Sequence, residues 1–455
     1  MSTKREHFGS RAAVVLTMAG SAIGLGNIWR FPYIVGEYGG AAFILIYILS
    51  TLIVSLPVFV AEVTVGRRSR KSAYGAMHSL RPGHKVWKFA GFLAVFTPLI
   101  INSYYSVIGG WSLDYFLRAC TGQFVSVEPS AASGIFGGFI SSVWGPIVCH
   151  LVFLGICALV VLFGVKSGIE KFSKITIPTL FFLIIAMIVY SVSLPGAMDG
   201  VRYLLKPDFS QITPRSFAFA LGQSFYSLSL GMGAIITYGS YVSKKEDIVL
   251  SGAGTAVSDL LFAILAGFAV MPAVFAAGIA PGAGTGLIFQ SIPYVFSSLG
   301  QEVPWLSTLF SVVFFLSILM AALTSCISLF EVGVSFLIDR SRWSRPKATL
   351  AVFLACGLLG VVCSLSFGPL AHIQISGKAI FDLLDWFSSN ILLLLLAFLT
   401  VIFVGFALPR QDVYDEITNG GTRPVNVKLF GFIYFLIKWV APVFIAIIFV
   451  TNFIL

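Results

Sequence analysis

Charged residues are scarce in this chain. Asp, Glu, Lys and Arg make up only 11% of its 455 residues, whereas 58% are hydrophobic and the mean hydropathy is +0.95. A soluble globular domain carries about 25% charged residues, so this composition argues against one. Apolar runs of about 20 residues, the length that crosses a bilayer, recur along nearly the whole chain. The sequence therefore predicts a polytopic membrane protein with no separate soluble domain.

Cysteine and histidine are also few. The five histidines follow no metal-ligand spacing and no nucleophile motif stands out, so we do not expect an enzyme. The six cysteines lie mostly inside apolar runs without paired spacing, which indicates neither a disulfide framework nor a metal site. We interpret them as small buried hydrophobic residues: Cys120, Cys149, Cys157, Cys326, Cys356 and Cys363.

The basic residues are distributed unevenly between the loops. The net charge of +10 could suggest a nucleic-acid partner, but 22 of the 29 Lys and Arg residues fall in alternate loops. This pattern follows the positive-inside rule and predicts a cytoplasmic N-terminus, with the lipid bilayer and no nucleic acid as partner. The sequence gives no indication of the oligomeric state.

Eleven spans are predicted, so the C-terminus should face outside. Two segments on the outer side, 121–138 and 278–304, are rich in Gly, Pro and Ser, and we expect them to form structured caps over an entrance. The predicted spans are 11–34, 41–66, 87–117, 145–164, 168–193, 214–241, 248–279, 304–338, 347–367, 376–407 and 428–453.

Two spans are interrupted by glycines. The first contains "AGSAIGLGNIWRFP" and the sixth contains "SLSLGMGAII", in which Gly231 and Gly233 are spaced as Gly24 and Gly26 are. Each glycine alone is compatible with a helix-packing face. Matching breaks instead indicate two five-helix repeats, 11–193 and 214–407, followed by 428–453 in a single transporter domain, 1–455.

Unwound backbone inside a membrane needs partners. Each unsatisfied carbonyl or N–H group costs several kcal/mol in hydrocarbon. Freed carbonyls suit a dehydrated cation, and half-helix N-termini suit a carboxylate. A zwitterionic amino acid with Na⁺ beside it satisfies both.

Long motifs in this chain resemble those of the neurotransmitter:sodium symporter family. They are "KREHFGSRAAVVLTMAGSAIGLGNIWRFP", "GQSFYSLSLGMGAIITYGSYV", "ALTSCISLFE" and "FDLLDWF", which together extend over essentially the whole chain. The resemblance implies an all-α LeuT-type fold of two inverted five-helix repeats plus one C-terminal helix. It also implies Na⁺-coupled amino acid symport by alternating access in a bacterial inner membrane, without an organic cofactor.

The resemblance further implies two Na⁺ sites built from hard oxygen ligands, which suit this cation. The first consists of the substrate carboxylate with Ala22, Asn27, Ser227 and Asp259. The second consists of the carbonyls of Gly20, Ile23 and Ala321 with the hydroxyls of Thr324 and Ser325.

Asp259 departs from many animal relatives, which carry Asn there and need chloride. In those relatives the chloride is held by groups resembling Tyr47, Gln223 and Ser227. A carboxylate within the membrane is expensive and is a functional hypothesis by default. Asp259 would supply the negative charge itself, which predicts chloride-independent transport. The alternative is a carboxylate that only hydrogen-bonds to its helix neighbours.

The substrate is predicted to be a hydrophobic amino acid, and the predicted range includes aromatic side chains. Family members that carry monoamines have Asp at the position of Gly24, whereas Gly leaves room for a substrate carboxylate. By resemblance the site comprises Ala22, Gly24, Leu25, Gly26, Ile101, Tyr105, Tyr226, Ser229, Met232, Ser325 and Leu329. An apolar pocket favours an apolar side chain. Met232 either broadens the accepted range or only fills space.

Gates on both sides also follow from the resemblance. Arg30 would pair with Asp385 in the outer gate, with Asp382 as the rival partner, and Arg5 would pair with Asp339 in the inner gate. The spacing from Gly168 to Pro178 resembles a motif linked to helix unwinding, the alternative being a static proline kink.

Two other functions remain open at this point. A non-transporting amino acid sensor on the same fold would have the same binding residues. A Na⁺ channel could also use broken helices, although paired gates favour alternating access.

Overall fold

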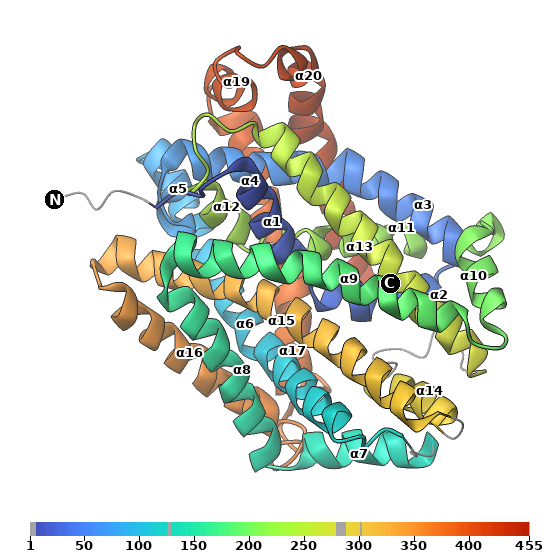
Figure 1. Cartoon of the computed structure of the whole chain (residues 1–455). Helices are drawn as coiled ribbons and strands as arrows, with labels where there is room; N and C mark the ends of the chain where they lie inside the picture. Colours follow the sequence, from blue (N-terminus) through green and yellow to red (C-terminus); the bar gives the residue numbers. More distant parts are fainter. Residues whose placement is uncertain (1–5, 126–128, 279–287, 301–302, 455) are drawn as a thin grey trace.

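The computed structural model describes residues 6–125, 129–278, 288–300 and 303–454, and Arg5 of the predicted inner gate lies outside them. Within these residues the chain is almost entirely helical (Figure 1). The strands in this part of the chain form one short antiparallel hairpin, β1 (Gln374–Ile375) and β2 (Lys378–Ala379).

Within the described residues, nine helices are long and apolar enough to cross a membrane. They are Gly40–Ser69 (α3, η2, α4), Lys85–Cys120 (α6), Trp144–Leu162 (α8), Val165–Val192 (η3, α9), Ile248–Ala276 (α13), Pro304–Ser341 (α15), Arg345–Leu365 (α16), Ile380–Ala407 (α17, η6, α18, η7) and Pro424–Asn452 (α20, η8, α21).

The first predicted span is a bent pair of helices. α1 (Arg11–Ala22) and the continuous η1 and α2 (Gly26–Glu37) meet at 55° and together form a tenth candidate span. The sixth predicted span is α11 (Pro214–Ser227) followed by α12 (Ala234–Gly239), both too short to cross a membrane alone. The total of eleven spans therefore stays a prediction.

Short helices cover both ends of the bundle. α7 (Pro129–Ser141) and α14 (Ser291–Gly300) lie beside each other at one end, and α10 (Ala197–Leu205) with the 3₁₀ turn η4 (Phe209–Gln211) lies at its edge (Figure 1). The expected structured caps are confirmed there, although 126–128, 279–287 and 301–302 lie outside the described residues. The opposite end carries α5 (Ala73–Leu80) and α19 (Arg410–Thr418).

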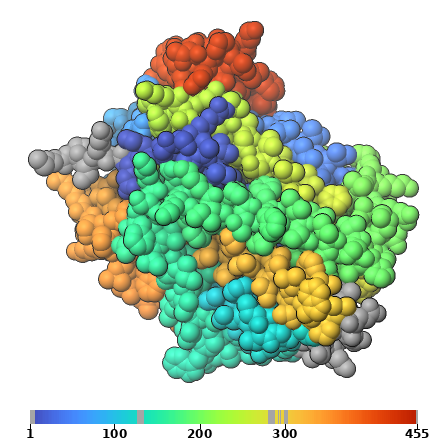
Figure 2. Space-filling view, in the orientation of Figure 1, coloured from blue at the N-terminus to red at the C-terminus, as the bar shows by residue number. Residues whose placement is uncertain are grey.

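A hairpin of α19 and α20 (Pro424–Phe435) projects from that opposite end, as the space-filling view also shows (Figure 2). Below it, the long helices α6 and α15 cross the middle of the molecule. Four cysteines are buried among these helices, but the interpretation of all six as buried is wrong. Cys120 is exposed because it is the last residue of α6, and Cys149 is half-buried.

The two helix breaks differ in backbone geometry. In the first, Ile23 leaves the helix with φ −72° and ψ 99°, and the chain resumes as a π-helical turn, η1 (Gly26–Arg30). In the second, Ser229, Gly231 and Gly233 adopt φ of 54°, 68° and 69°. A Cβ on Gly231 would lie 2.0 Å from the Leu393 carbonyl oxygen. The second break therefore requires glycine for both its conformation and its packing.

We expect Gly231→Ala to destabilise the protein. The left-handed conformation alone costs an L-residue about 1–2 kcal/mol, before the clash with Leu393 is added. The matched control is Gly222→Ala in α11, where a new Cβ meets nothing within 4 Å. Thermal unfolding of purified protein should show a lowered midpoint for the first variant only. Equal midpoints would contradict this account of the break.

Candidate binding site

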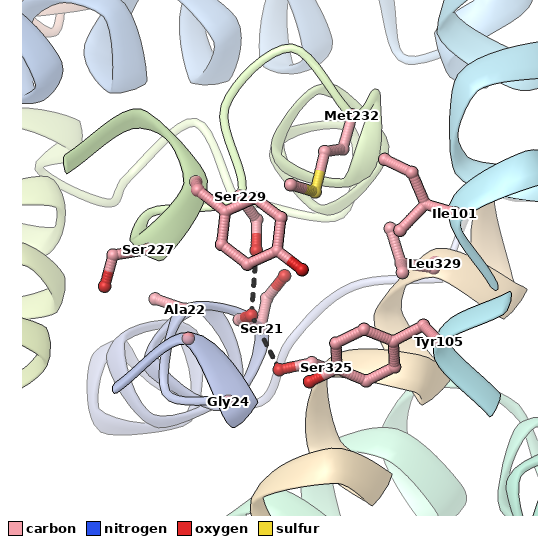
Figure 3. Close-up of a pocket in the computed structure, with 12 residues that line it drawn as sticks. Ser21, Ala22, Gly24, Ile101, Tyr105, Ser227, Ser229, Met232, Ser325 and Leu329 are labelled. Atoms are coloured by element: carbon pink, nitrogen blue, oxygen red, sulfur yellow. Dashed lines mark hydrogen bonds between the residues drawn. The ribbon is translucent and has the colours of Figure 1, made fainter. Parts of the chain in front are cut away.

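The two breaks face each other across a central cavity (Figure 3). α6 and α15 complete the wall with side chains that the sequence already suggested. The lining residues are Ser21, Ala22, Gly24, Gly26, Ile101, Tyr105, Tyr226, Ser227, Ser229, Met232, Ser325 and Leu329. The structure thus brings together all the predicted substrate residues except Leu25, whose N–H group binds the Tyr105 hydroxyl.

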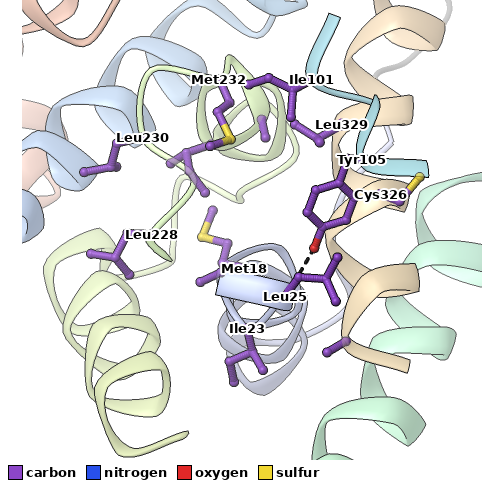
Figure 4. Close-up of a cluster of buried hydrophobic side chains, with 14 of the residues drawn as sticks. Met18, Ile23, Leu25, Ile101, Tyr105, Leu228, Leu230, Met232, Cys326 and Leu329 are labelled. Carbon is purple, nitrogen blue, oxygen red and sulfur yellow. Dashed lines mark hydrogen bonds between the residues drawn. The ribbon is translucent and has the colours of Figure 1, made fainter. Parts of the chain in front are cut away.

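Two backbone N–H groups of the first break are bound to side chains beside the cavity, since the Gly24 N–H group donates to Asn27 Oδ1 at 3.1 Å. The Leu25 N–H group donates to the Tyr105 hydroxyl at 3.1 Å (Figure 4). The neighbouring Gly24 has no room for a side chain, because a Cβ would lie 2.3 Å from Ser325 Oγ and 2.9 Å from the Tyr105 hydroxyl. This side of the cavity therefore excludes an additional protein side chain at position 24.

The other polar feature is the carbonyl of Ser21, which the sequence analysis missed. It accepts hydrogen bonds from Ser229 Oγ at 2.8 Å and from Ser325 Oγ at 3.2 Å (Figure 3). The Ser21 hydroxyl points elsewhere and donates to Ser328 Oγ. The only signal in the sequence was its place between Gly20 and Gly24, since a backbone acceptor can come from any residue type.

The remaining wall is apolar. Ile101, Met232 and Leu329 gather on one side of the cavity, opposite the first break (Figure 4). No Asp, Glu, Lys, Arg or His lines the cavity within the described residues. An apolar side chain therefore fits this wall, whereas a charged one would lose its solvation without finding a partner.

Asp259 does not line the cavity but contacts Ser227, which does, and the predicted Na⁺ ligands Asn27, Ser227 and Asp259 meet there. Its Oδ1 accepts from Asn27 Nδ2 at 2.8 Å, and both of its carboxylate oxygens lie 2.8 Å from Ser227 Oγ. Tyr47 contributes a weaker contact at 3.4 Å. Gln223 instead donates to the Gly26 carbonyl at 3.0 Å. In this structure the buried carboxylate is surrounded by donors, namely Asn27 Nδ2 and the Ser227 and Tyr47 hydroxyls. Its carboxylate and hydroxyl oxygens are hard ligands of the kind that suit a small cation.

The predicted second Na⁺ site lies between α1 and α15. Thr324 Oγ1 is 3.0 Å from the Ala321 carbonyl oxygen and 3.3 Å from that of Ile23. Gly20 is adjacent, since its Cβ would lie 3.6 Å from Thr324 Cβ. Ser325 differs, because its hydroxyl donates to the Ser21 carbonyl in the central cavity.

A larger cavity lies outside the rings of Tyr105 and Tyr226, which line both cavities. Arg30, Asp382 and Asp385 all line it. The Arg30 guanidinium lies over the Tyr226 ring at 5.1 Å, and Asp385 accepts from Ser389 Oγ at 3.2 Å. Among the described residues, no direct ion pair joins Arg30 to either carboxylate. The predicted outer gate residues are therefore neighbours that are not in contact as an ion pair.

On the opposite side, Asp339 accepts a hydrogen bond from the Ser72 N–H group at 2.6 Å. Its predicted partner Arg5 lies outside the described residues. Gly168 lies in the π-helical turn η3 (Val165–Glu170), which runs directly into α9 (Lys171–Val192) around Pro178. The segment predicted to unwind is wound in this conformation.

Glu62 is a buried acid that the sequence analysis missed, unlike Asp259. Its Oε1 accepts from the Gly231 N–H group at 2.7 Å, and it is fully buried in α4 (Leu56–Ser69). The signal was available, since a carboxylate in an apolar span is costly without a partner. Glu62 satisfies part of the backbone that the second break leaves open.

We expect Gly24→Ala to reduce ligand affinity by at least about ten-fold, roughly 1.4 kcal/mol, because the methyl group would displace Tyr105 or Ser325. Gly431→Ala in α20 is the control, since its Cβ meets nothing within 4 Å. Equilibrium binding of a radiolabelled amino acid measures the difference. Wild-type affinity in the first variant would contradict this account of position 24.

Comparison with known proteins places the chain among secondary transporters. Residues 5–127 and 140–455 match the model of the sodium:neurotransmitter symporter family. An uncharacterized sodium-dependent transporter of Bacillus subtilis is 36% identical over 449 residues, 98% of each chain. A sodium- and chloride-dependent creatine transporter of Oryctolagus cuniculus is 26% identical over 91% of this chain and 72% of its own length. The crystal structure of MhsT in complex with L-phenylalanine superimposes with a TM-score of 0.89 at 38% identity, covering 99% of this chain and all of that one.

Proposed function

Because the chain belongs to the sodium:neurotransmitter symporter family, we propose that it couples Na⁺ entry to the uptake of an apolar or aromatic L-amino acid. Its overall fold is of the LeuT type. The central cavity carries this proposal, because Tyr105, whose hydroxyl binds the Leu25 N–H group, and Ser21, whose carbonyl accepts from Ser229, line it opposite an apolar wall. A zwitterion with an apolar side chain complements these groups. The phenylalanine bound to MhsT supports an aromatic substrate.

Two Na⁺ ions are proposed to bind on either side of the first break. The cluster around Asp259 would hold one beside the substrate carboxylate, and Thr324 with the Ala321 and Ile23 carbonyls would hold the other. Each ion would then satisfy carbonyls that the break frees, so substrate and ions stabilise the same local conformation. Coupling follows, since neither ligand binds as well without the other.

Transport is proposed to proceed by alternating access. Repeats 11–193 and 214–407 would move around the central site, with 428–453 outside them, in a bacterial inner membrane with the N-terminus in the cytoplasm. Arg30 and Asp385 would approach each other when the outer cavity closes, and Arg5 with Asp339 would act on the inner side. In this structure Arg30 and Asp385 form no ion pair, so the outer cavity would still have to close for them to meet.

The proposal is tested by uptake in proteoliposomes. We expect Na⁺-dependent accumulation that apolar and aromatic amino acids inhibit best when all twenty are compared. Counterflow of labelled substrate would separate a carrier from a sensor, which binds without exchange. Na⁺ conduction without any organic substrate would instead support a channel and contradict the proposal.

Chloride is expected to be unnecessary, because Asp259 supplies a negative charge at the first Na⁺ site. Replacing chloride with gluconate should leave wild-type uptake unchanged. Asp259→Asn should weaken Na⁺ affinity by roughly ten-fold or more in gluconate, since it removes one full charge from a buried site, and chloride should restore part of the loss. Asp199→Asn, which changes an exposed pair with Arg202, is the matched control. Chloride-dependent uptake by the wild type would refute the idea.

A further inference from the structure

The segment 240–247 connects α12, the inner half of the sixth span, to α13 (Ile248–Ala276), and its last four residues are called the loop 244–247. Each of its four residues is held by a group outside the loop. Lys244 Nζ donates to Glu416, and the Lys245 carbonyl accepts from Arg423 at 2.9 Å. The Glu246 carbonyl accepts from Arg67 at 2.6 Å and from Asn419 at 3.0 Å, and Asp247 Oδ1 accepts from Asn426 at 2.9 Å. Such a run of attachments fixes a loop that would otherwise be mobile.

All but one of these groups belong to the hairpin of α19 and α20, and the exception is Arg67 of α4. Arg67 itself is bound to the hairpin, because its Nε donates to Glu416 Oε2 at 2.7 Å. Its Nη2 donates to the Glu416 carbonyl and to Asn419 Oδ1. The side chains of Arg67 and Glu416 are only 1% and 2% exposed. One buried carboxylate of the hairpin, that of Glu416, therefore binds both α4 and the loop.

Three basic side chains surround the Glu416 carboxylate. Arg68 lies 3.6 Å away, in addition to Arg67 and Lys244. Burial raises the pKa of the Glu416 carboxyl, but Arg67 and Lys244 outweigh burial and hold it below its ordinary value. The carboxylate is therefore ionised at neutral pH, and the contact is permanent rather than a pH switch.

α12 is packed against α4 one residue before Arg67. A Cβ on Gly66 would lie 2.0 Å from the Ile236 carbonyl oxygen, so the two backbones touch. α12 also follows the break that lines the substrate cavity. A movement that opens the cavity towards this end of the molecule must either separate α12 from α4 or move the two helices together. In both cases the loop 244–247 must move as well.

We propose that the α19–α20 hairpin is a clamp on the cytoplasmic gate and that Glu416 is its positioning residue, holding α12 closed through Arg67 and the loop 244–247. This role rests on the proposed alternating-access function. The clamp restrains opening towards the cytoplasm, so its release should favour the inward-open population. The apparent affinity for external Na⁺ would then fall, because fewer molecules are in the outward-facing state.

Hydrogen–deuterium exchange of the full-length protein in nanodiscs tests the clamp. We expect Glu416→Gln to increase exchange of amides in 234–247 by roughly ten-fold, because removing one partner of a buried ion pair leaves the other uncompensated. Asp412→Asn is the control, since Asp412 lies on the same helix and pairs with Arg68 at 2.5 Å but does not bind the loop. An increase confined to the hairpin, or of the same size in the control, would overturn the proposal.

A second variant covers the case in which Glu416→Gln destabilises the whole protein. Lys244→Gln combined with Arg423→Gln removes two of the loop attachments at exposed positions and leaves the Arg67–Glu416 pair intact. A smaller increase in exchange within 234–247 is expected. No increase in this folded variant would overturn the clamp.

Uptake kinetics provide the readout that a purely structural role would not change. Release of the clamp should raise the KM for external Na⁺ without lowering the maximal rate, whereas loss of folded protein lowers only the maximal rate. A lowered maximal rate with an unchanged KM would count against the clamp. The exchange measurement needs no substrate, so a failure of the proposed transport function would be seen separately, as absent uptake by the wild type.

Discussion

The structure depends on how a membrane protein satisfies the backbone of a broken helix. Both breaks place N–H and carbonyl groups where water is excluded, and each unpaired group costs several kcal/mol. The partners come from other spans: Tyr105 faces the Leu25 N–H group, Glu62 binds the Gly231 N–H group, and Ser229 donates to the Ser21 carbonyl. The proposed binding site is therefore built from the same residues that allow the helices to be interrupted.

Much of this arrangement could be predicted from the sequence because it depends on residue type. Glycine at Gly231 and Gly233 signals a backbone that side chains would exclude, and Asp259 in an apolar span signals a partner or an ion. The family motifs assigned the side chains around the cavity, and the geometry brings them together. The exposure of Cys120 was predicted wrongly, because this residue belongs to an apolar stretch that ends at the surface.

The remainder depended on backbone direction and on contacts distant in sequence. The Ser21 carbonyl is an acceptor only because the chain turns at Ile23, a geometry that no residue type specifies. The position of Arg30 over Tyr226 reflects the conformation adopted and not only the residues present. Arg67 and Glu416 are 349 residues apart, and in the sequence each resembles an ordinary charged residue between two spans.

π-helical turns recur in the spans, among them η2 (Thr51–Ser55), η7 (Phe403–Ala407) and η8 (Leu436–Val440). A π turn holds one more residue than an α-helical turn, so the helix beyond it keeps its face towards the same neighbours despite the extra residue. In the second span, Glu62 and Arg67 both follow η2. The π turn therefore takes up the extra residue before them, and their side chains keep the same neighbours. Such turns are points where the length of a span can change by one residue during evolution without rotating the charged groups that follow.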